Sequence, residues 1–576
     1  MVTWDLEQIY PFKDTEKLIS ELKRKADDFV KYRDELDPKM SAERFMDLLR
    51  EFEKMSVLSN KLNAYASLSL SEDTSDSEKN MHVARISELD SDISNKLMFF
   101  DLWFKSLSDK DAKRYIDNAG KYSYFLKKIR QFKKFTLSEK EEKIINIKDL
   151  TGSEVLVRLY DLVANKFKYR WGKKEITQSE LTKHVKSSKE EERKKAYDLL
   201  LGRYKEHEAL LGELYKNIIL DWKNENIKLR GFEKPISPRN LSNDVDDKTV
   251  DALLDVTRKN IRIYHEYFRL KAKLIKKKKL ERYDIYAPAT KSAKKYNYQE
   301  SKKIVLDAYR SFSDQAYEYA KEIFDKNHVH SELKAGKQGG AFCSSVTKDM
   351  PPYILLNFTG VLNDVFTMMH EFGHGIHSRA ARNQTQFTFH SSLPMAETAS
   401  IFGETLLGYK LLSESEKKEK IALLVNSLDS HYASIIRQAY FVIFEKDAHD
   451  LIAKGCTVDD LNKLYYDNLK EQFGSSINVP KIFSHEWKYI PHIYHTPFYC
   501  YAYAFGNLMG LSLYGEYDKD RKGFPEKYMR LLASGGSLSP ADILKKQMGI
   551  EINDRTFWQE GFDIIKLQVK ELKDLM

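Results

Sequence analysis

Two histidines four residues apart are the first candidates for chemistry. Residues 363–382 read NDVFTMMHEFGHGIHSRAAR, and on a helix His370 and His374 project from the same face, one turn apart. Two ligands of one tetrahedral zinc ion need this spacing. Glu371 lies about 100° around the helix from His370, where it can touch a water at the metal without occupying the metal. The pattern predicts a zinc site with Glu371 as the general base of a hydrolysis.

The motif alone does not exclude two ordinary histidines on a solvated helix, so a third ligand is decisive. A catalytic zinc site has three protein ligands and one open position. Residues 372–396 contain no Asp or Glu, and the next carboxylate is Glu397, on what looks like a second helix. Ala380 stands ten positions after His370, where the three-histidine class would have a histidine. We therefore predict that His370, His374 and Glu397 hold the metal.

Two more residues near this motif have candidate roles. Glu404 follows Glu397 by seven residues, two turns along the same helical face. It is predicted to accept a hydrogen bond from the other ring nitrogen of a ligand histidine, and a solvated surface carboxylate is the alternative. His377 lies seven residues after His370, too far along the helix to share the metal comfortably. It is either a supporting or substrate-side histidine, or part of ordinary packing.

A cluster of rings further along the chain offers hydrogen-bond donors without net charge. Residues 492–503 include two histidines and four tyrosines. Such donors can stabilise the oxyanion that forms when a peptide carbonyl is attacked. Aromatic stripes are also common in protein cores, so packing is the alternative. Given the metal motif upstream, we expect at least one histidine and one tyrosine of this segment to face the metal.

The elements that must position these residues are predominantly helical. The chain has 13 prolines but none between Pro38 and Pro235, and such a proline-free stretch permits long helices. Apolar residues from Phe45 to Leu62 recur every three or four positions, with Ser41 as a candidate cap. The apolar series from Leu199 to Ile219 predicts another helix.

Turn signals mark where the helical pattern stops. Residues 227–244 combine Gly, Pro and Asn and are interpreted as a loop. Residues 336–360 contain GG, PP and a short apolar run, which predicts one or two strands of a small sheet. Helical periodicity returns at Val361, with Asn363 or Asp364 as candidate cap, and a flexible interruption is expected at residues 534–537.

The composition is that of a globular protein. Apolar residues make up 42% and charged residues 31% of the 576 residues, and no stretch approaches the roughly 18 consecutive apolar residues of a membrane span. The N-terminus has no basic segment followed by an apolar run, so a cytoplasmic location is expected. Three scattered cysteines do not form a disulfide framework. The net charge of +9 is modest and the lysine run 276–279 has no interleaved aromatics, so neither nucleic acid nor membrane is expected as a partner.

At these residues the sequence resembles the thimet-oligopeptidase-like zinc peptidases of family M3, and within them the oligoendopeptidase F group. The resemblance covers most of the chain. Its specific parts are the extended zinc motif and the tyrosine-rich segment. The matching positions are residues 4–6, 282–286, 340–342, 357–358, 370–377, 397–400, 497–499, 501, 503 and 535–536.

The resemblance implies a mainly α fold, a helical ellipsoid with a deep substrate channel between two halves and a small β-sheet beside the zinc-binding helices. It implies two domains: residues 1–190 cover one side of the channel, and residues 191–576 form the catalytic domain. It also implies one Zn2+ per chain on the three predicted ligands, with Glu371 as base. Tyr503 resembles the tyrosine with which this family stabilises the transition state, and His495 and Tyr499 are its expected neighbours.

The expected activity is that of a zinc-dependent endopeptidase acting on short, unfolded oligopeptides. A zinc-activated water and Glu371 would hydrolyse internal peptide bonds. An extended substrate would pair as an added strand near residues 340–344 or 353–358. Two alternatives stay open: a helical zinc carboxypeptidase that trims C-terminal residues, and a non-enzymatic helical scaffold. The cleavage preference and the oligomeric state stay open as well.

Overall fold

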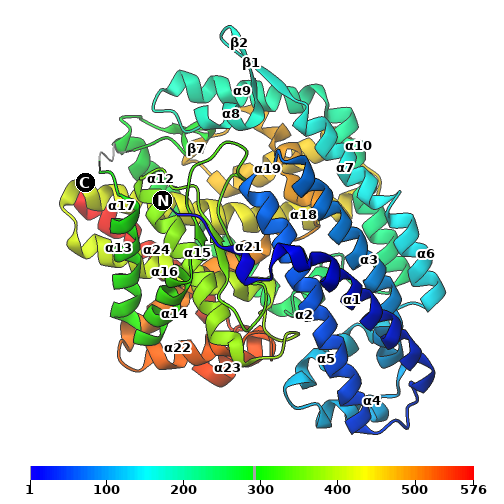
Figure 1. The fold of residues 1–576 in the computed structure, drawn as a ribbon. Helices are drawn as coiled ribbons and strands as arrows, with labels where there is room; N and C mark the ends of the chain where they lie inside the picture. Colours follow the sequence, from blue (N-terminus) through cyan, green and yellow to red (C-terminus); the bar gives the residue numbers. More distant parts are fainter. Residues whose placement is uncertain (1, 290–293) are drawn as a thin grey trace. The chain divides into compact units, whose positions relative to one another are not determined.

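The fold is built almost entirely of helices. The structure, a computed structural model, describes residues 2–289 and 294–576. The strands in it are few and short (Figure 1). The mainly α fold with a small sheet, expected from the sequence, is confirmed. Within the described residues, no helix combines the length and the apolar character that crossing a bilayer requires.

Contacts within the chain define two compact units, each assembled from three segments. Unit 1 takes the described residues of Met1–Glu139, Lys294–Leu407 and Glu516–Glu551, and unit 2 those of Lys140–Ala293, Gly408–Gly515 and Ile552–Met576. The division expected at residue 190 is contiguous in sequence, whereas each unit includes residues from both sides of that position. The channel between two halves stays a prediction.

Unit 1 contains the N-terminal helices, a small sheet and the helices beside the sheet. Its elements are α1 (Thr15–Val30), α2 (Ala42–Glu72), α3 (Ser77–Ser106), α4 (Asp109–Asn118), α5 (Ser123–Gln131), α13 (Tyr298–Phe312), α14 (Asp314–Asp325), β4 (Val329–His330), β5 (Phe342–Ser344), β6 (Tyr353–Leu355), α15 (Leu362–Ala380), most of α16 (Leu393–Glu414), α22 (Phe524–Ala533) and α23 (Pro540–Met548).

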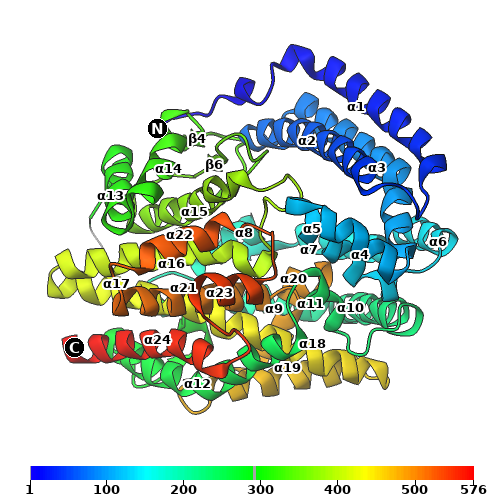
Figure 2. The ribbon, with the colours of Figure 1, turned by 90° about the horizontal axis from the view of Figure 1, so that it is seen from below.

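Unit 2 contains the remaining helices and two short pairs of strands. Its elements are α6 (Glu139–Asp149), α7 (Ser153–Asn165), β1 (Lys168–Trp171), β2 (Lys174–Thr177), α8 (Gln178–His184), α9 (Glu190–Glu206), α10 (Glu208–Trp222), α11 (Ser237–Ser242), α12 (Asp247–Leu274), β3 (Leu280–Glu281), α17 (Lys417–His431), α18 (Arg437–Ala453), α19 (Val458–Phe473), β7 (Ile477–Asn478), α20 (Pro491–His495), most of α21 (Tyr501–Lys519) and α24 (Arg555–Leu575). Helices α12 and α24 run side by side in it (Figure 2).

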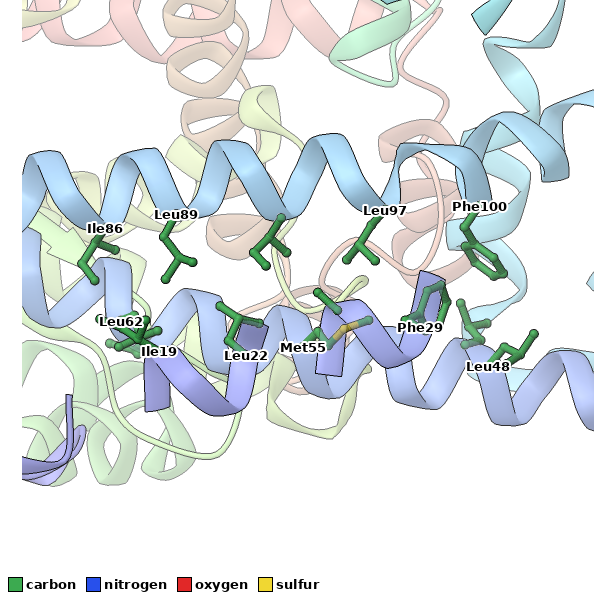
Figure 3. Packing of buried hydrophobic residues seen from close by; sticks show 14 of the residues in the cluster. Ile19, Leu22, Phe29, Leu48, Met55, Leu62, Ile86, Leu89, Leu97 and Phe100 are labelled. Atoms are coloured by element: carbon green, nitrogen blue, oxygen red, sulfur yellow. The ribbon is translucent and has the colours of Figure 1, made fainter. Parts of the chain in front are cut away.

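The proline-free N-terminal stretch forms the long helices that its sequence predicts. Helix α2 begins after Ser41, whose side chain accepts a hydrogen bond of 3.1 Å from the Arg44 amide, so the predicted cap is confirmed. Apolar side chains three or four residues apart lie along one face of each helix. Figure 3 shows how these faces interlock: Ile19, Leu22 and Phe29 of α1 and Leu48, Met55 and Leu62 of α2 face Ile86, Leu89, Leu97 and Phe100 of α3.

Two local predictions were wrong. The apolar series from Leu199 to Ile219 forms two helices, because the chain departs from helical geometry at His207, between α9 and α10. A ring nitrogen of His207 contacts the Arg203 carbonyl oxygen at 3.1 Å. The loop expected at residues 227–244 contains the short helix α11, which has Pro238 in its first turn and buries Pro238 and Asn240.

The strands expected between residues 336 and 360 are present as β5 and β6. They form a three-stranded sheet with β4, in the order β4-β6-β5. Strand β6 is central, pairing parallel to β4 and antiparallel to β5, with Cys343 opposite Ile354. Strand β5 is an outer strand of this sheet, and it packs against α15, the helix of the histidine motif.

Candidate metal centre

Helix α15 carries the histidine motif and starts with an acidic cap. The Asp364 carboxylate accepts hydrogen bonds of 2.7, 2.7 and 3.1 Å from the amides of Thr359, Gly360 and Val361. The sequence suggests Asn363 or Asp364 as the residue before the helix. The structure places Asp364 inside the first turn, where its negative charge also suits the helix dipole.

A glycine lets the second helix approach closely enough to deliver a third ligand. Gly373 of α15 faces α16, and a Cβ added there would lie 2.4 Å from Ser400 Cα and 2.6 Å from the Ala399 oxygen. Both atoms belong to the backbone of α16, so any side chain at position 373 would displace that helix. This close approach brings Glu397 next to His370 and His374.

The three predicted ligands converge with the spacing of a tetrahedral site. His370 Nε2 lies 3.2 Å from His374 Nε2 and 3.3 Å from Glu397 Oε2, and His374 Nε2 lies 3.8 Å from Glu397 Oε2. Donor atoms about 2.0–2.1 Å from a tetrahedral zinc ion lie roughly 3.3–3.4 Å apart. Two imidazole nitrogens and one carboxylate oxygen are also the donors that catalytic zinc sites use. The residues present therefore fit the ion.

Contacts behind the ligands fix their orientation. His370 Nδ1 lies 2.5 Å from Glu404 Oε1, so the contact predicted for Glu404 is confirmed. His374 forms a hydrogen bond with the backbone of Ala396. The Ser400 hydroxyl donates to Glu397 Oε2 at 3.2 Å. Supporting contacts of this kind direct the free nitrogen of each ring toward the metal position.

The electrostatics of the metal-free site show where a proton resides. Burial alone lowers the pKa of His370, but hydrogen bonds to Glu397 and Glu404 raise it well above its usual value. Burial and the nearby His370 charge lower the pKa of His374 to about 4. Although burial works in the opposite direction, the hydrogen bond to His370 lowers the pKa of Glu397 to about 2. Without metal, His370 is therefore the positive partner of two carboxylates.

The general-base candidate Glu371 is held in a dry environment. Its side chain is 6% exposed, and burial raises its pKa to about 7, while the His370 charge works against this rise. A base whose pKa lies near the working pH is well suited to proton transfer.

Metal binding should release protons at neutral pH. Zinc binds neutral imidazole, so it must displace the proton on His370, whose raised pKa keeps it protonated at pH 7. His374 is already neutral there and contributes none. We expect about one proton released per zinc, and an affinity that rises with pH until the raised pKa of His370 is passed. Calorimetric titration in buffers of different ionisation enthalpy measures this number, and zero protons at pH 7 would contradict the assignment.

Gly373→Ala should disrupt the site without touching a ligand. The added methyl group meets backbone atoms of α16, so Glu397 must move away from the histidines. We expect about 1–3 kcal/mol of destabilisation and at least about tenfold weaker zinc binding, measured by denaturation and by chelator competition. Gly202→Ala is the matched control, because a Cβ at this helical glycine meets nothing within 4 Å and should leave zinc affinity unchanged. Unaltered zinc affinity in Gly373→Ala would refute the role of the close approach.

A cavity of about 420 Å³ lies over these residues and is lined by strand β5 on one side. His377 also lines it, 6% exposed, with a pKa that burial lowers to about 4. It is therefore a neutral histidine at the cavity wall, in line with the supporting or substrate-side role considered from the sequence. Phe389 and His390 contribute a further part of the wall.

The segment expected to be a flexible interruption supports this wall. The Gly536 amide donates to the Thr388 oxygen at 2.8 Å. Gly535 has φ of +50°, and a Cβ there would lie 2.7 Å from the same oxygen. Positive φ together with this contact requires glycine at position 535. The predicted interruption of the helical pattern is confirmed, since α22 ends at Ala533 and α23 begins at Pro540, and its flexibility stays a prediction. The two glycines are needed for close packing behind Phe389 and His390.

In unit 2, the ring cluster expected from the sequence forms around a different histidine. The rings of Tyr499 and Tyr503 lie 5.3 Å apart, and His492 lies 6.2 Å from Tyr499 and 6.0 Å from Tyr503. His495 instead contacts Asp161 Oδ1 at 2.8 Å through Nε2, at an exposed position. The structure thus brings Tyr499 and Tyr503 together with His492.

Three polar residues hold this segment: Glu445 and Asn243, which are buried, and Arg239, which is half-buried. Glu445 accepts a hydrogen bond of 2.8 Å from the amide of Phe498, whose φ of +59° is strained for a non-glycine residue. Arg239 donates to the Pro497 oxygen at 3.1 Å, and Asn243 donates to the Tyr501 hydroxyl at 2.8 Å. No sequence signal could have revealed them, because each lies far from the segment along the chain.

The comparisons with known proteins find peptidases, in agreement with the metal site described above. The model of peptidase family M3 matches residues 184–564, and that of the oligopeptidase F N-terminal region matches residues 103–169. The chain is similar to an oligoendopeptidase F homologue of Borreliella burgdorferi, with 28% identity over 99% of this chain and 98% of the relative. It is also similar to the chromosomal oligoendopeptidase F of Lactococcus lactis subsp. cremoris, with 27% identity over 100% of this chain and 97% of the relative.

Solved structures show the same architecture. A structure from Chlamydophila abortus superposes with a TM-score of 0.85 at 25% identity, covering 100% of this chain and 98% of that chain. The oligoendopeptidase F of Enterococcus faecium superposes with a TM-score of 0.74 at 19% identity, covering 97% and 99%, and supports the fold alone. Since the family model spans most of the chain, including all three metal-site residues, the protein belongs to peptidase family M3 and is an enzyme of the metalloendopeptidase class.

Proposed function

We propose that this enzyme is a zinc-dependent oligopeptidase that cleaves internal bonds of short, unfolded peptides, with zinc held by His370, His374 and Glu397. The observation that carries the proposal is the spacing of 3.2, 3.3 and 3.8 Å between the three donor atoms. The names of the relatives, oligoendopeptidases, support the substrate class.

Glu371 acts as the general base in this proposal. When bound, zinc polarises the scissile carbonyl and acidifies the attacking water. Glu371, adjacent to the first ligand and nearly buried, takes the proton of that water. It then delivers the proton to the leaving amine. Glu404 keeps the His370 ring oriented throughout, through the contact at Nδ1.

The substrate backbone is proposed to pair with strand β5. Of the two edges considered from the sequence, β6 has neighbours on both sides, whereas β5 is an outer strand and lines the cavity over the metal site. Pairing through the backbone ignores side chains, which suits an enzyme that accepts many peptides.

Tyr503 is proposed to donate a hydrogen bond to the oxyanion. His495 was the neighbour expected from the resemblance, and this expectation stays a prediction. The ring contacts favour His492. Tyr503→Phe should lower kcat about 10²–10³-fold with little change in KM, because the donor acts in the transition state. His492→Ala should lose more activity than His495→Ala, whose exposed ring contacts Asp161. Full activity in Tyr503→Phe, measured on a quenched peptide, would refute the donor role.

An internally quenched peptide blocked at both ends tests the proposed activity. An endopeptidase cuts it, whereas a carboxypeptidase needs a free C-terminus. We expect cleavage at an internal bond, abolished by a chelator and restored by zinc. Cleavage only of peptides with free C-termini, one residue at a time, would favour the carboxypeptidase alternative. Family membership argues against a non-enzymatic scaffold.

A further inference from the structure

Unit 2 contains a buried group of charges with one excess positive charge. Arg282 and Arg437 both donate to a single carboxylate oxygen, Glu486 Oε1, at 2.6 and 3.2 Å. The Tyr465 hydroxyl donates to the other oxygen of Glu486 at 3.1 Å. Arg282 and Glu486 are each 1% exposed. Two guanidinium groups therefore share one buried carboxylate.

Several donors in this group have no acceptor. Nε and Nη1 of Arg282 and Nε of Arg437 are buried without a hydrogen-bond partner among the described residues, and so is the Tyr286 hydroxyl. The rings of Phe483 and Phe473 lie 5.0 and 5.6 Å from the Arg282 guanidinium and partly compensate it. Water could satisfy single donors, but it cannot neutralise the surplus charge. An anion beside Arg437 would neutralise it.

Arg437 is the member of this group that a ligand can reach. Its side chain is 21% exposed, whereas the side chain of Arg282 is 1% exposed. It follows a π-helical turn, Tyr432–Ile436, and such turns occur often at functional sites. Its charge also acts on His492, which packs against Tyr499 and Tyr503. The unpartnered Nε of Arg437 is itself buried, so a ligand would meet the exposed remainder of this side chain, beside the proposed substrate-binding rings.

We propose that Arg437 binds a carboxylate of the peptide substrate. This carboxylate neutralises the positive charge that Glu486 alone does not compensate. The inference rests on the proposed peptidase function. Two sources offer this chemistry: the C-terminal carboxylate and an acidic side chain of the peptide.

Arg437→Met tests the proposal and should fold. Without Arg437, Glu486 keeps Arg282 and Tyr465, so the buried pair becomes neutral. We expect a melting temperature equal to or above that of the wild type. Arg437→Lys keeps the charge and should behave in between. Arg262→Met is the matched control, an exposed arginine of α12 in the same unit.

Two matched peptide pairs separate the two carboxylate sources. The first pair differs only in a free or amidated C-terminus, and the second in one internal Glu or Gln. In one of the two pairs, the peptide with the carboxylate should have a kcat/KM about tenfold higher than its matched partner, for both the wild type and Arg262→Met. Arg437→Met should lose this preference. Binding of the same peptides to Glu371→Gln, followed by fluorescence anisotropy, should show the same preference without turnover.

Each outcome bears on the proposal. Loss of preference for the first pair assigns the C-terminal carboxylate, and loss for the second assigns the acidic side chain. If the wild type cleaves all four peptides equally well, the carboxylate site is refuted while the peptidase function stands. A lowered melting temperature in Arg437→Met with unchanged preference would show a purely structural arginine. If no peptide is bound or cleaved, both proposals are overturned.

Discussion

Glu371→Gln should retain zinc at wild-type stoichiometry and lose about 10²–10⁴-fold in kcat. The amide has the size of the carboxylate, and residue 371 is not among the three ligands, so the metal site keeps its geometry. The lost function is proton acceptance. The setting of Glu371 supports a large effect: it is 6% exposed, and in the metal-free site burial raises its pKa to about 7.

The test combines elemental analysis with turnover of the blocked peptide. Glu414→Gln is a suitable control, since Glu414 lies on α16 but is exposed and pairs with Lys410. This control should keep full activity. Substantial turnover by Glu371→Gln would mean that another group accepts the proton.

His374→Ala should lose both the metal and the activity. The two remaining donors, His370 and Glu397, are already hydrogen-bonded to one another, and a zinc site with two protein ligands is weak. We expect less than about one tenth of the wild-type zinc content after dialysis, and no activity at micromolar zinc.

His377→Ala is the matched control for this experiment. His377 lies on the same helix and lines the same cavity, but its ring is not among the three converging donors. It should keep stoichiometric zinc even if catalysis changes. Full zinc occupancy in His374→Ala would exclude His374 as a ligand.

The spacing of the chemistry-bearing residues made much of the site predictable. On a helix, residues four apart must share a face, so His370 and His374 follow from their positions alone. Glu397 was identifiable because no other carboxylate lies between it and Glu371. Glu404 followed from its two-turn spacing to Glu397. The long helices of the N-terminal region followed from the absence of proline and from the apolar periodicity.

The remainder depends on tertiary contacts that have no local signal. Gly373 allows α15 and α16 to touch, and Gly535 supports the cavity wall. Nothing in the sequence distinguishes these two glycines from the other glycines of the chain. The choice of His492 over His495 as the ring neighbour depends on how α20 and α21 pack. Arg437 and Glu486, 49 residues apart, meet only in the folded chain. The break at His207 lies in a mostly polar stretch, residues 202–209, between two apolar groups of the same series, and it carries no Gly–Pro turn signal.

Anomalous diffraction at the zinc absorption edge tests the central claim most directly. Crystals of the purified protein should show one strong peak about 2.0–2.2 Å from His370 Nε2, His374 Nε2 and a Glu397 oxygen. A second group of possible ligands, Asp149, Asp221 and Glu225, consists of carboxylates alone and should show no peak. A zinc peak at this second group, with none between the two histidines and Glu397, would contradict the account.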